Sequence, residues 1–248
     1  MKFFQFIKLA RKRLVGFKKG EQNNYVEFQE FQAKEILNEL RKRKIDLSKM
    51  NVLELGVGSG GYSIIFKENS NDLTINDIGR PYILNVDPSI KFKMFDVTKK
   101  FPLEDNSFDF VFCCSLIEHI PKPDMVIKEI RRVLKPKGYL YMSFPPFYSP
   151  VGGHFLKPFH LLGEKLCLKI YNWLKKDNIK SFATMYDRNY GNYGLHRTTI
   201  RKAKKMLKDN EFIISSTWTR FSPVNTAKIP FLNEIITWHV CFLGKNQK

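Results

Sequence analysis

The chain has 248 residues, 43% of them apolar, which is typical of one large globular domain or of one domain with an insertion. The longest uncharged stretch, residues 138–156, contains three prolines and therefore argues against a membrane-spanning helix. The four cysteines show no metal-ligand spacing and two of them are adjacent in an apolar run, which indicates buried thiols in a reducing compartment.

The formal net charge is +18, and it is unevenly distributed along the chain. Residues 1–50 carry 13 basic and 6 acidic side chains, residues 51–156 carry 12 of each, and residues 157–208 carry 13 basic and 3 acidic. A neutral central segment between basic flanks favours an anionic partner such as nucleic acid, an acidic glycan or an anionic membrane. A lysine-rich surface with no partner would have the same composition.

The N-terminal residues predict two helices. Apolar residues recur at helical spacing between Phe3 and Phe17, with lysines and arginines between them. This pattern predicts a cationic amphipathic helix, which either lies in a membrane interface or caps its own domain. The same basic residues interrupt any signal-peptide core, so we expect a cytoplasmic protein, with peripheral attachment to the inner membrane face as an option. A second helix is expected over residues 24–44.

From residue 51 onward, strand and helix patterns alternate, with strands near 51–55, 72–78, 91–95, 108–114, 139–144, 212–219 and 237–243 and helices over 60–69, 125–134 and 198–210. This alternation predicts an α/β fold with a doubly wound, mostly parallel seven-stranded sheet of the Rossmann-like type. The chain is therefore expected to have four segments. These are the basic N-terminal helices (1–50), the cofactor-binding core (51–146), an inserted lid rich in aromatic residues and lysine (147–198), and the C-terminal completion of the sheet (199–248).

The most informative motif is a glycine-rich turn after the first strand of the core, with an acid placed just before it. Gly56, Gly58 and Gly61 satisfy the dinucleotide pattern G-x-G-x-x-G, in which a helix N-terminus cradles a pyrophosphate. The carboxylate of Glu54 beside that turn would repel a pyrophosphate. A ligand with an ammonium and a sulfonium but no phosphate, such as S-adenosylmethionine, suits the acid better.

Polar residues also follow the next strands, at the sheet edge where such folds bind ligands. Asp77 lies 21 residues after Gly56, the spacing at which an acid meets ribose hydroxyls. Asp96 follows the third strand and is suited to accept a hydrogen bond from an adenine amino group. Ser115, Glu118 and His119 follow the fourth strand.

Together these stretches resemble a class I S-adenosylmethionine-dependent methyltransferase of the small-molecule, type 11-like kind. The resemblance covers residues 50–146, and a weaker similarity follows at residues 194–212. The stretches that carry it are VLELGVGSGGYS, LTINDI, FDVTKKFPLEDNSFDFVFCCSLIEHI and IKEIRRVLKPKGYLYMSFPP. The resemblance implies that Glu54 with Gly56, Gly58 and Gly60 holds the methionine part of the cofactor, and that Asp77 holds the ribose. It further implies that Asp96 with Val97 binds the adenine and that the backbone near Ser115 lines the methyl-donor region. Lys137 stands where the family more often has glycine.

Methyl transfer to an alcohol requires removal of its proton, for which a histidine is the usual agent. We expect His119 to be this base, while a structural role under the cofactor or as a helix cap is the alternative. His154, His160 and His196 lie in or beside the insertion and would serve equally well. Ubiquinone-type O-methyltransferases bind Mg²⁺ through Glu-x-x-Glu-His at this place. Here Ser115 replaces the first acid, so no metal is expected.

The sequence leaves several classes of methyl acceptor open. The first hypothesis is O-methylation of a small-molecule, glycan or lipid-linked anionic acceptor, with lid aromatics lining the acceptor pocket. Most lid aromatics are nevertheless expected to form a small core. The alternative is an RNA methyltransferase, which the basic flanks and interleaved aromatics favour. A non-catalytic binding protein and an NAD oxidoreductase are less favoured because of Glu54, Asp77 and Asp96. The oligomeric state is not indicated.

Overall fold

The computed structural model describes residues 22–185, 193–220, 222 and 224–248. The amphipathic helix expected between Phe3 and Phe17 lies outside these residues and stays a prediction. Among the described residues, no helix has the length and apolar character needed to cross a bilayer.

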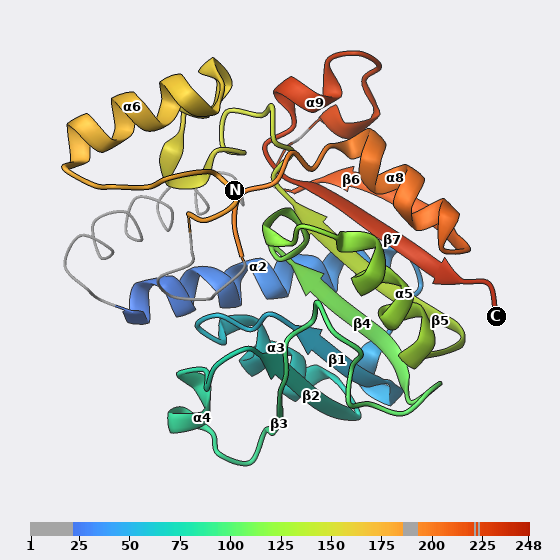
Figure 1. The fold of residues 1–248 in the computed structure, drawn as a ribbon. Helices are drawn as coiled ribbons and strands as arrows, with labels where there is room; N and C mark the ends of the chain where they lie inside the picture. The colour runs from blue at the N-terminus through green and yellow to red at the C-terminus, as the bar shows by residue number, and fades with distance from the viewer. Residues whose placement is uncertain (1–21, 186–192, 221, 223) are drawn as a thin grey trace. The chain divides into compact units, whose positions relative to one another are not determined.

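Seven strands form one sheet in the order β3-β2-β1-β4-β5-β7-β6 (Figure 1). Their bounds are β1 Asn51–Leu55, β2 Asp72–Asp77, β3 Lys91–Met94, β4 Phe108–Cys114, β5 Leu134–Phe144, β6 Phe212–Thr219 and β7 Val240–Asn246. Strand β2 pairs in parallel with β1 and with β3, whereas β7 runs antiparallel to β5 and β6. The predicted doubly wound, mostly parallel seven-stranded sheet is therefore confirmed.

The α-helices between the strands are α2 Gln22–Lys42, α3 Gly61–Asn69, α4 Ile83–Val86, α5 Pro123–Val133, α6 Glu164–Lys175, α8 Ile200–Asp209 and α9 Asn233–Ile236. Short 3₁₀ turns lie at η1 Leu47–Lys49, η2 Ile117–His119, η3 His154–Leu156, η4 Phe159–Leu162 and η5 Thr226–Lys228. The helices expected over 24–44, 60–69, 125–134 and 198–210 correspond to α2, α3, α5 and α8.

Two strands differ from their expected bounds by three residues or more. Strand β5 begins at Leu134 rather than at residue 139, and Lys137 within it has φ 62°. Strand β7 begins at Val240 rather than at Thr237. The backbone N–H of Thr237 instead bonds to the carbonyl of Asn233 and closes α9, so this residue belongs to a helix end.

The chain divides into two compact units. Unit 1 comprises residues 1–97, 101–112 and 132–138, and unit 2 comprises 98–100, 113–131 and 139–248. The core of unit 1 lies around the fully buried residues of β1, and α3 packs over it through an edge-to-face pair between Phe66 and Phe112 at 4.5 Å.

Within unit 2, the insertion after β5 has a small core of its own. Buried Phe147, Leu156, Cys167, Leu168, Phe182, Met185 and Leu195 form one cluster, with Phe159, Tyr171 and Ile179 packed against it. Helix α6 contributes its apolar face to this cluster and leaves Trp173 79% exposed. Several lid aromatics are thus core residues, as the sequence analysis expected for most of them.

Candidate functional site

Unit 1 contains the glycine turn between β1 and α3. Gly56, Gly58 and Gly60 have φ of 72°, 58° and 88°, a left-handed conformation that side chains disfavour. The backbone N–H of Gly56 bonds to the carbonyl of Asn76 at 3.0 Å, and that of Gly60 bonds to Val57 at 3.2 Å. The turn is therefore anchored to β2 and leads directly into the first turn of α3, where backbone N–H groups favour anionic or polar ligand groups.

Glu54 lies at the end of β1 and is 1% exposed. One of its carboxylate oxygens accepts a hydrogen bond from the Ser63 hydroxyl on α3 at 2.7 Å. A buried carboxylate is costly unless polar or cationic groups compensate it. Its position beside the turn therefore favours a cationic ligand group over a phosphate.

Asp77 ends β2 and closes the turn from the other side. Its Oδ2 accepts from the Gly58 N–H at 3.0 Å and its Oδ1 from the Ile78 N–H at 2.7 Å. Asp96 follows β3 by two residues and is half-buried, and Val97 beside it is buried. Glu54, Asp77 and Asp96 thus end successive parallel strands, as predicted. Their roles toward a cofactor remain a prediction.

The contribution of α2 to this turn was not expected from the sequence. The side chain of Gln29 accepts from the Gly61 N–H at 3.0 Å, and the Tyr62 hydroxyl donates to Gln32. A Cβ on Gly61 would lie 2.5 Å from the carbonyl oxygen of Val26, so glycine permits α2 to approach. Isolated glutamines on a helix face give no sequence signal of such a contact.

Unit 2 contains the groups that follow β4. Ser115 is exposed, has φ 52° and donates its backbone N–H to the Ser143 carbonyl at 2.8 Å. Behind it, the buried Arg220 donates from Nη2 to the Ser143 hydroxyl at 2.7 Å and to Tyr141 Oη and Cys114 Sγ at 3.1 Å each. Arg220 was not expected from the sequence, because nothing near it in the chain marks a buried cation.

Glu118, His119 and His154 come together in the same unit. The Nε2 atoms of His154 and His119 lie 3.7 and 4.0 Å from Oε1 of Glu118, and the two rings are 4.6 Å apart. Burial raises the pKa of Glu118 well above its usual value. Burial lowers the pKa of His119 to about 4, although its hydrogen bond to the Gly194 carbonyl opposes that shift. His119 is therefore neutral at pH 7.

The other histidines are also buried or half-buried. His160 donates from Nε2 to the Phe147 carbonyl at 2.9 Å and supports the lid core. The backbone N–H of His196 bonds to the Glu118 carbonyl at 2.9 Å, so its segment lies against the cluster. Burial lowers the pKa of His196, and burial together with the Arg220 charge lowers that of His239. His154 and the backbone of His196 are thus close to Glu118, whereas His160 bonds within the lid core.

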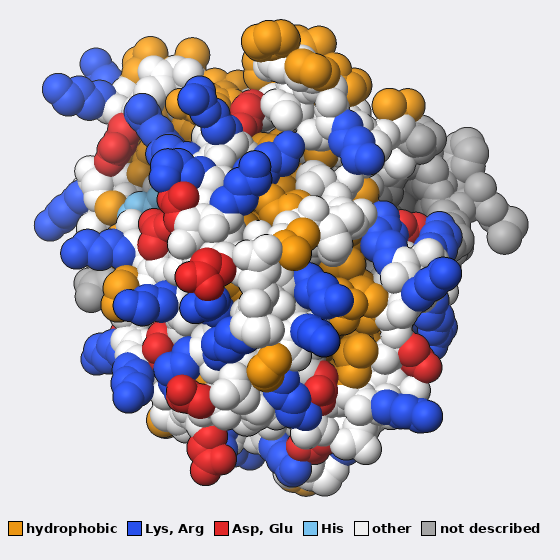
Figure 2. Space-filling view, turned by 90° about the vertical axis from the view of Figure 1, so that its right-hand side faces the viewer, with side chains coloured by type: hydrophobic (Ala, Val, Ile, Leu, Met, Phe, Trp, Pro, Cys, Tyr) orange, Lys and Arg blue, Asp and Glu red, His pale blue; other side chains and the backbone are white. Residues whose placement is uncertain are grey.

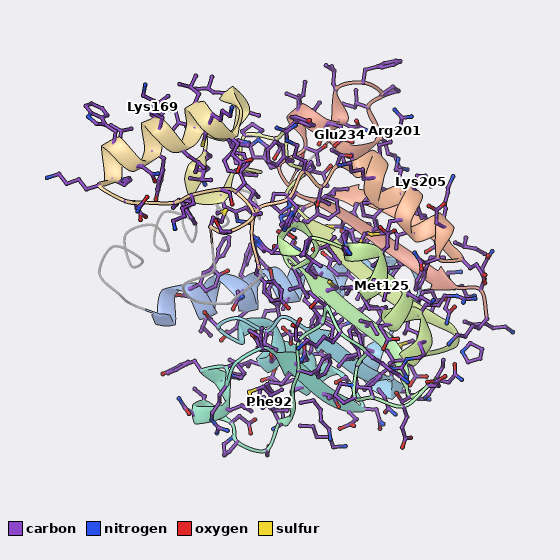
Figure 3. All side chains as sticks on the ribbon, in the orientation of Figure 1. Phe92, Met125, Lys169, Arg201, Lys205 and Glu234 are labelled. Atoms are coloured by element: carbon purple, nitrogen blue, oxygen red, sulfur yellow. The ribbon has the colours of Figure 1, made fainter. Side chains whose placement is uncertain are left out.

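Basic side chains are spread over the face that Figure 2 shows, with acidic side chains between them, and hydrophobic side chains gather at the upper edge. Lys169 on α6 and Arg201 and Lys205 on α8 project from their helices (Figure 3). The α8 N-terminus is capped by the carboxylate of Glu234, which accepts from the N–H groups of Ile200 and Arg201 at 2.9 Å.

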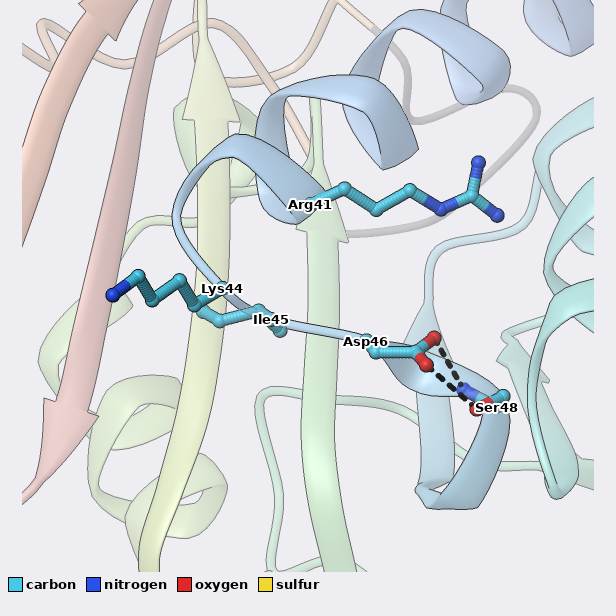
Figure 4. Close-up of a pocket in the computed structure, with 5 residues that line it drawn as sticks. All are labelled: Arg41, Lys44, Ile45, Asp46 and Ser48. Atoms are coloured by element: carbon cyan, nitrogen blue, oxygen red, sulfur yellow. Dashed lines mark hydrogen bonds between the residues drawn. The ribbon is translucent and has the colours of Figure 1, made fainter.

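One depression of about 470 Å³ in unit 1 is lined by Arg41, Lys44, Ile45, Asp46 and Ser48 (Figure 4). It lies before β1, whereas ligands of parallel sheets bind after the strands. The Asp46 carboxylate is occupied by hydrogen bonds from the Ser48 N–H at 3.1 Å and hydroxyl at 2.9 Å. The depression is therefore not a candidate for the cofactor site.

Comparison with known proteins finds similarity to methyltransferases. Residues 53–142 match the family described as a methyltransferase domain. An uncharacterized methyltransferase of Mycobacteroides abscessus is 27% identical over 138 residues, which is 54% of this chain and 50% of that protein. A ubiquinone biosynthesis O-methyltransferase of Xanthomonas oryzae pv. oryzae is 28% identical over 107 residues, or 40% and 45%.

Among solved structures, an S-adenosylmethionine-dependent methyltransferase from Mesorhizobium loti has a TM-score of 0.57 and 15% identity, with 84% of this chain and 96% of that chain covered. A likeness at this identity shows the fold. The chain spans about half the length of the two curated relatives named above.

Proposed function

We propose that this chain, whose residues 53–142 match a methyltransferase domain, transfers a methyl group from S-adenosylmethionine to an oxygen of an anionic acceptor. The acceptor is a small molecule, a glycan or a lipid-linked glycan. Transfer proceeds in line: the acceptor oxygen bonds to the methyl carbon, the carbon–sulfur bond breaks, and S-adenosylhomocysteine leaves.

The observation that carries this proposal is the buried Glu54 carboxylate, tied to Ser63, beside a glycine turn with three left-handed residues. Glu54 and the turn residues Gly56, Gly58 and Gly60 would hold the methionine part, Asp77 the ribose, Asp96 and Val97 the adenine, and Ser115 the methyl-donor region. The retained acids also disfavour a non-catalytic binding protein, which would not need them.

His119 is the proposed catalytic group. Its Nδ1 must carry the proton, because the Gly194 carbonyl 2.8 Å away can only accept a hydrogen bond. The Nε2 of the neutral ring is then able to take a proton from an acceptor hydroxyl. His119→Ala should keep the affinity for S-adenosylhomocysteine and lower turnover by about 10²–10⁴-fold. Full turnover in that variant, or loss of cofactor binding, would assign His119 a structural role.

The class of acceptor can be tested with a tritiated methyl group. Purified protein and labelled S-adenosylmethionine are added to a cell extract, which is then separated into lipid, glycan, RNA and small-molecule fractions, with Glu54→Ala as the background control. Label in the glycan, lipid or small-molecule fraction supports the proposal. Label that is confined to RNA, with RNA binding that weakens steeply as salt rises, would replace it with the alternative.

A lipid-linked acceptor finds support in exposed apolar residues of unit 2. Phe231 is 97% exposed, and Leu232, Ile235 and Trp238 are each more than half exposed. Aromatic residues of this kind are common at membrane interfaces. Together with the cationic residues 1–19, they would attach a cytoplasmic protein to anionic lipid. Vesicle sedimentation at low and high salt tests this, and a full-length chain that stays in the supernatant at low salt contradicts it.

A further inference from the structure

Three side chains with metal-binding atoms converge in unit 2 although they lie in two separate segments. Glu118 and His119 come from η2 after β4, and His154 begins η3 in the insertion, 35 residues further along the chain. One ligand atom of each residue lies within 4.8 Å of the other two. Spacing in the sequence did not connect His154 with the other two residues.

The carboxylate of Glu118 is only partly compensated. Its side chain is 2% exposed, and neither carboxylate oxygen makes a hydrogen bond with another described residue. Its own backbone N–H and the charge of Arg220 favour the ionised form, but burial outweighs both. The Nε2 atoms of His154 and His119 lie 3.7 and 4.0 Å from Oε1. A buried charge in such surroundings needs a cation or a proton close by.

The orientation of His119 shows which kind of atom faces the carboxylate. Its Nδ1 donates to the Gly194 carbonyl at 2.8 Å, so the neutral ring presents a lone pair at Nε2. A histidine whose far nitrogen is fixed by a backbone carbonyl is the usual arrangement around a protein-bound metal. The Nε2 lone pair and the carboxylate oxygen repel each other. A cation between these two atoms would be attracted by both.

The backbone also holds His154 in this position. Its φ is 51°, a conformation that residues other than glycine seldom adopt. The preceding Gly153 packs so closely on the lid that a Cβ there would lie 2.2 Å from Nδ1 of His160. The lid core therefore constrains the segment that presents His154.

We propose that Glu118, His119 and His154 bind one divalent first-row transition ion. Two imidazoles and one carboxylate suit Zn²⁺, Fe²⁺, Mn²⁺ or Co²⁺, whereas Mg²⁺ prefers oxygen ligands. Metal–ligand bonds of about 2.0–2.2 Å place neighbouring donor atoms roughly 3.0–3.5 Å apart. The observed 3.7 and 4.0 Å therefore need to shorten by about 0.2–1.0 Å, and the two histidine donors, which lie within 4.8 Å of each other, also need to approach. The expectation of no metal rested on Ser115 in place of an acid, and His154 supplies the third ligand from elsewhere.

An ion with three protein ligands keeps positions open for other oxygens. On the proposed function, an acceptor hydroxyl that binds there loses its proton to water, and the resulting oxygen anion attacks the methyl carbon. In the ion-bound protein, His119 would be a ligand in place of the base proposed above, because its single Nε2 lone pair cannot both bind the ion and accept a proton.

The test is metal binding without any assay of activity. Protein without a histidine tag is treated with a chelator, dialysed and titrated with Co²⁺, which is followed by visible absorption and calorimetry. One Co²⁺ per chain is expected, displaceable by Zn²⁺. Glu118→Gln and His154→Gln should each weaken binding at least about 100-fold, beyond the 10–100-fold typical of residues behind the ligands.

The matched control is Glu164→Gln, the same carboxylate-to-amide change in the same insertion, at a residue that accepts from the Phe182 N–H. It should keep Co²⁺ affinity, and circular dichroism without metal confirms that each variant is folded. Absent Co²⁺ binding in the wild type, or equal loss in Glu164→Gln and Glu118→Gln, would overturn the site. Methyl transfer that survives complete chelation would overturn the ion's role in the reaction and leave the proposed function in place. Co²⁺ binding without S-adenosylmethionine binding would uphold the site and remove the function.

Discussion

Gly60 and Gly58 provide a matched pair of substitutions in the glycine turn. Both have left-handed φ, 88° and 58°, which costs an alanine about 1–2 kcal/mol. They differ in the space available to a side chain. A Cβ at Gly60 would lie 2.3 Å from Cβ and 2.8 Å from Cγ2 of Ile83, whereas at Gly58 it would meet nothing within 4 Å.

Ile83 is 1% exposed and begins α4, so it cannot move away freely. Overpacking of this kind adds about 1–3 kcal/mol. We therefore expect Gly58→Ala to lower the free energy of unfolding by about 1–2 kcal/mol and Gly60→Ala by about 2–5 kcal/mol.

The assay is urea unfolding of both variants, followed by circular dichroism and analysed by linear extrapolation. Gly79→Ala is the neutral control, because its φ is not left-handed and no atom lies within 4 Å of its added Cβ. Equal destabilisation at positions 58 and 60 would show that Ile83 does not pack against the turn as described. The reasoning on this turn would then be refuted.

Two further predictions concern charged groups. Arg220→Met should cost about 1–3 kcal/mol of stability in urea unfolding, because it leaves the buried hydroxyls of Ser143 and Tyr141 without their guanidinium donor. A variant as stable as the wild type would contradict this. The pKa of Asp87 is lowered to about 2, mainly by the hydrogen bond that Lys67 donates to it. The stability that this interaction contributes is therefore fully present above the unfolded-state pKa near 3.8 and is lost as the pH falls toward 2. Asp87→Asn should thus be less stable than wild type at pH 6, with a difference that narrows between pH 5 and 3, and a constant difference across that range would argue against the pair.

The strands and the ends of the strands could be predicted from the sequence because their patterns are local. Glu54, Asp77 and Asp96 each follow an apolar run, and parallel strands bring such ends to one edge of the sheet. Lys137 was noted as a departure from glycine, and its φ of 62° explains why glycine is favoured there.

What could not be predicted depends on contacts between distant segments. Strand β7 extends to Asn246 because it pairs with β5 and β6, although Gly244, Lys245 and Asn246 form no apolar run. Gln29 reaches the glycine turn from α2, and His154 reaches Glu118 from the insertion. No periodicity in the sequence encodes either approach.

The glycine turn as a binding site for S-adenosylmethionine is the central claim, and calorimetry tests it most directly. Wild-type protein should bind S-adenosylhomocysteine and S-adenosylmethionine and should not bind NAD, since Glu54 is buried beside the turn. Asp77→Ala should weaken binding by about 1–3 kcal/mol, roughly 5- to 150-fold. The surface variant Asp87→Asn should bind like the wild type. Binding of NAD in preference to S-adenosylhomocysteine, or wild-type affinity in Asp77→Ala, would contradict the assignment of this site.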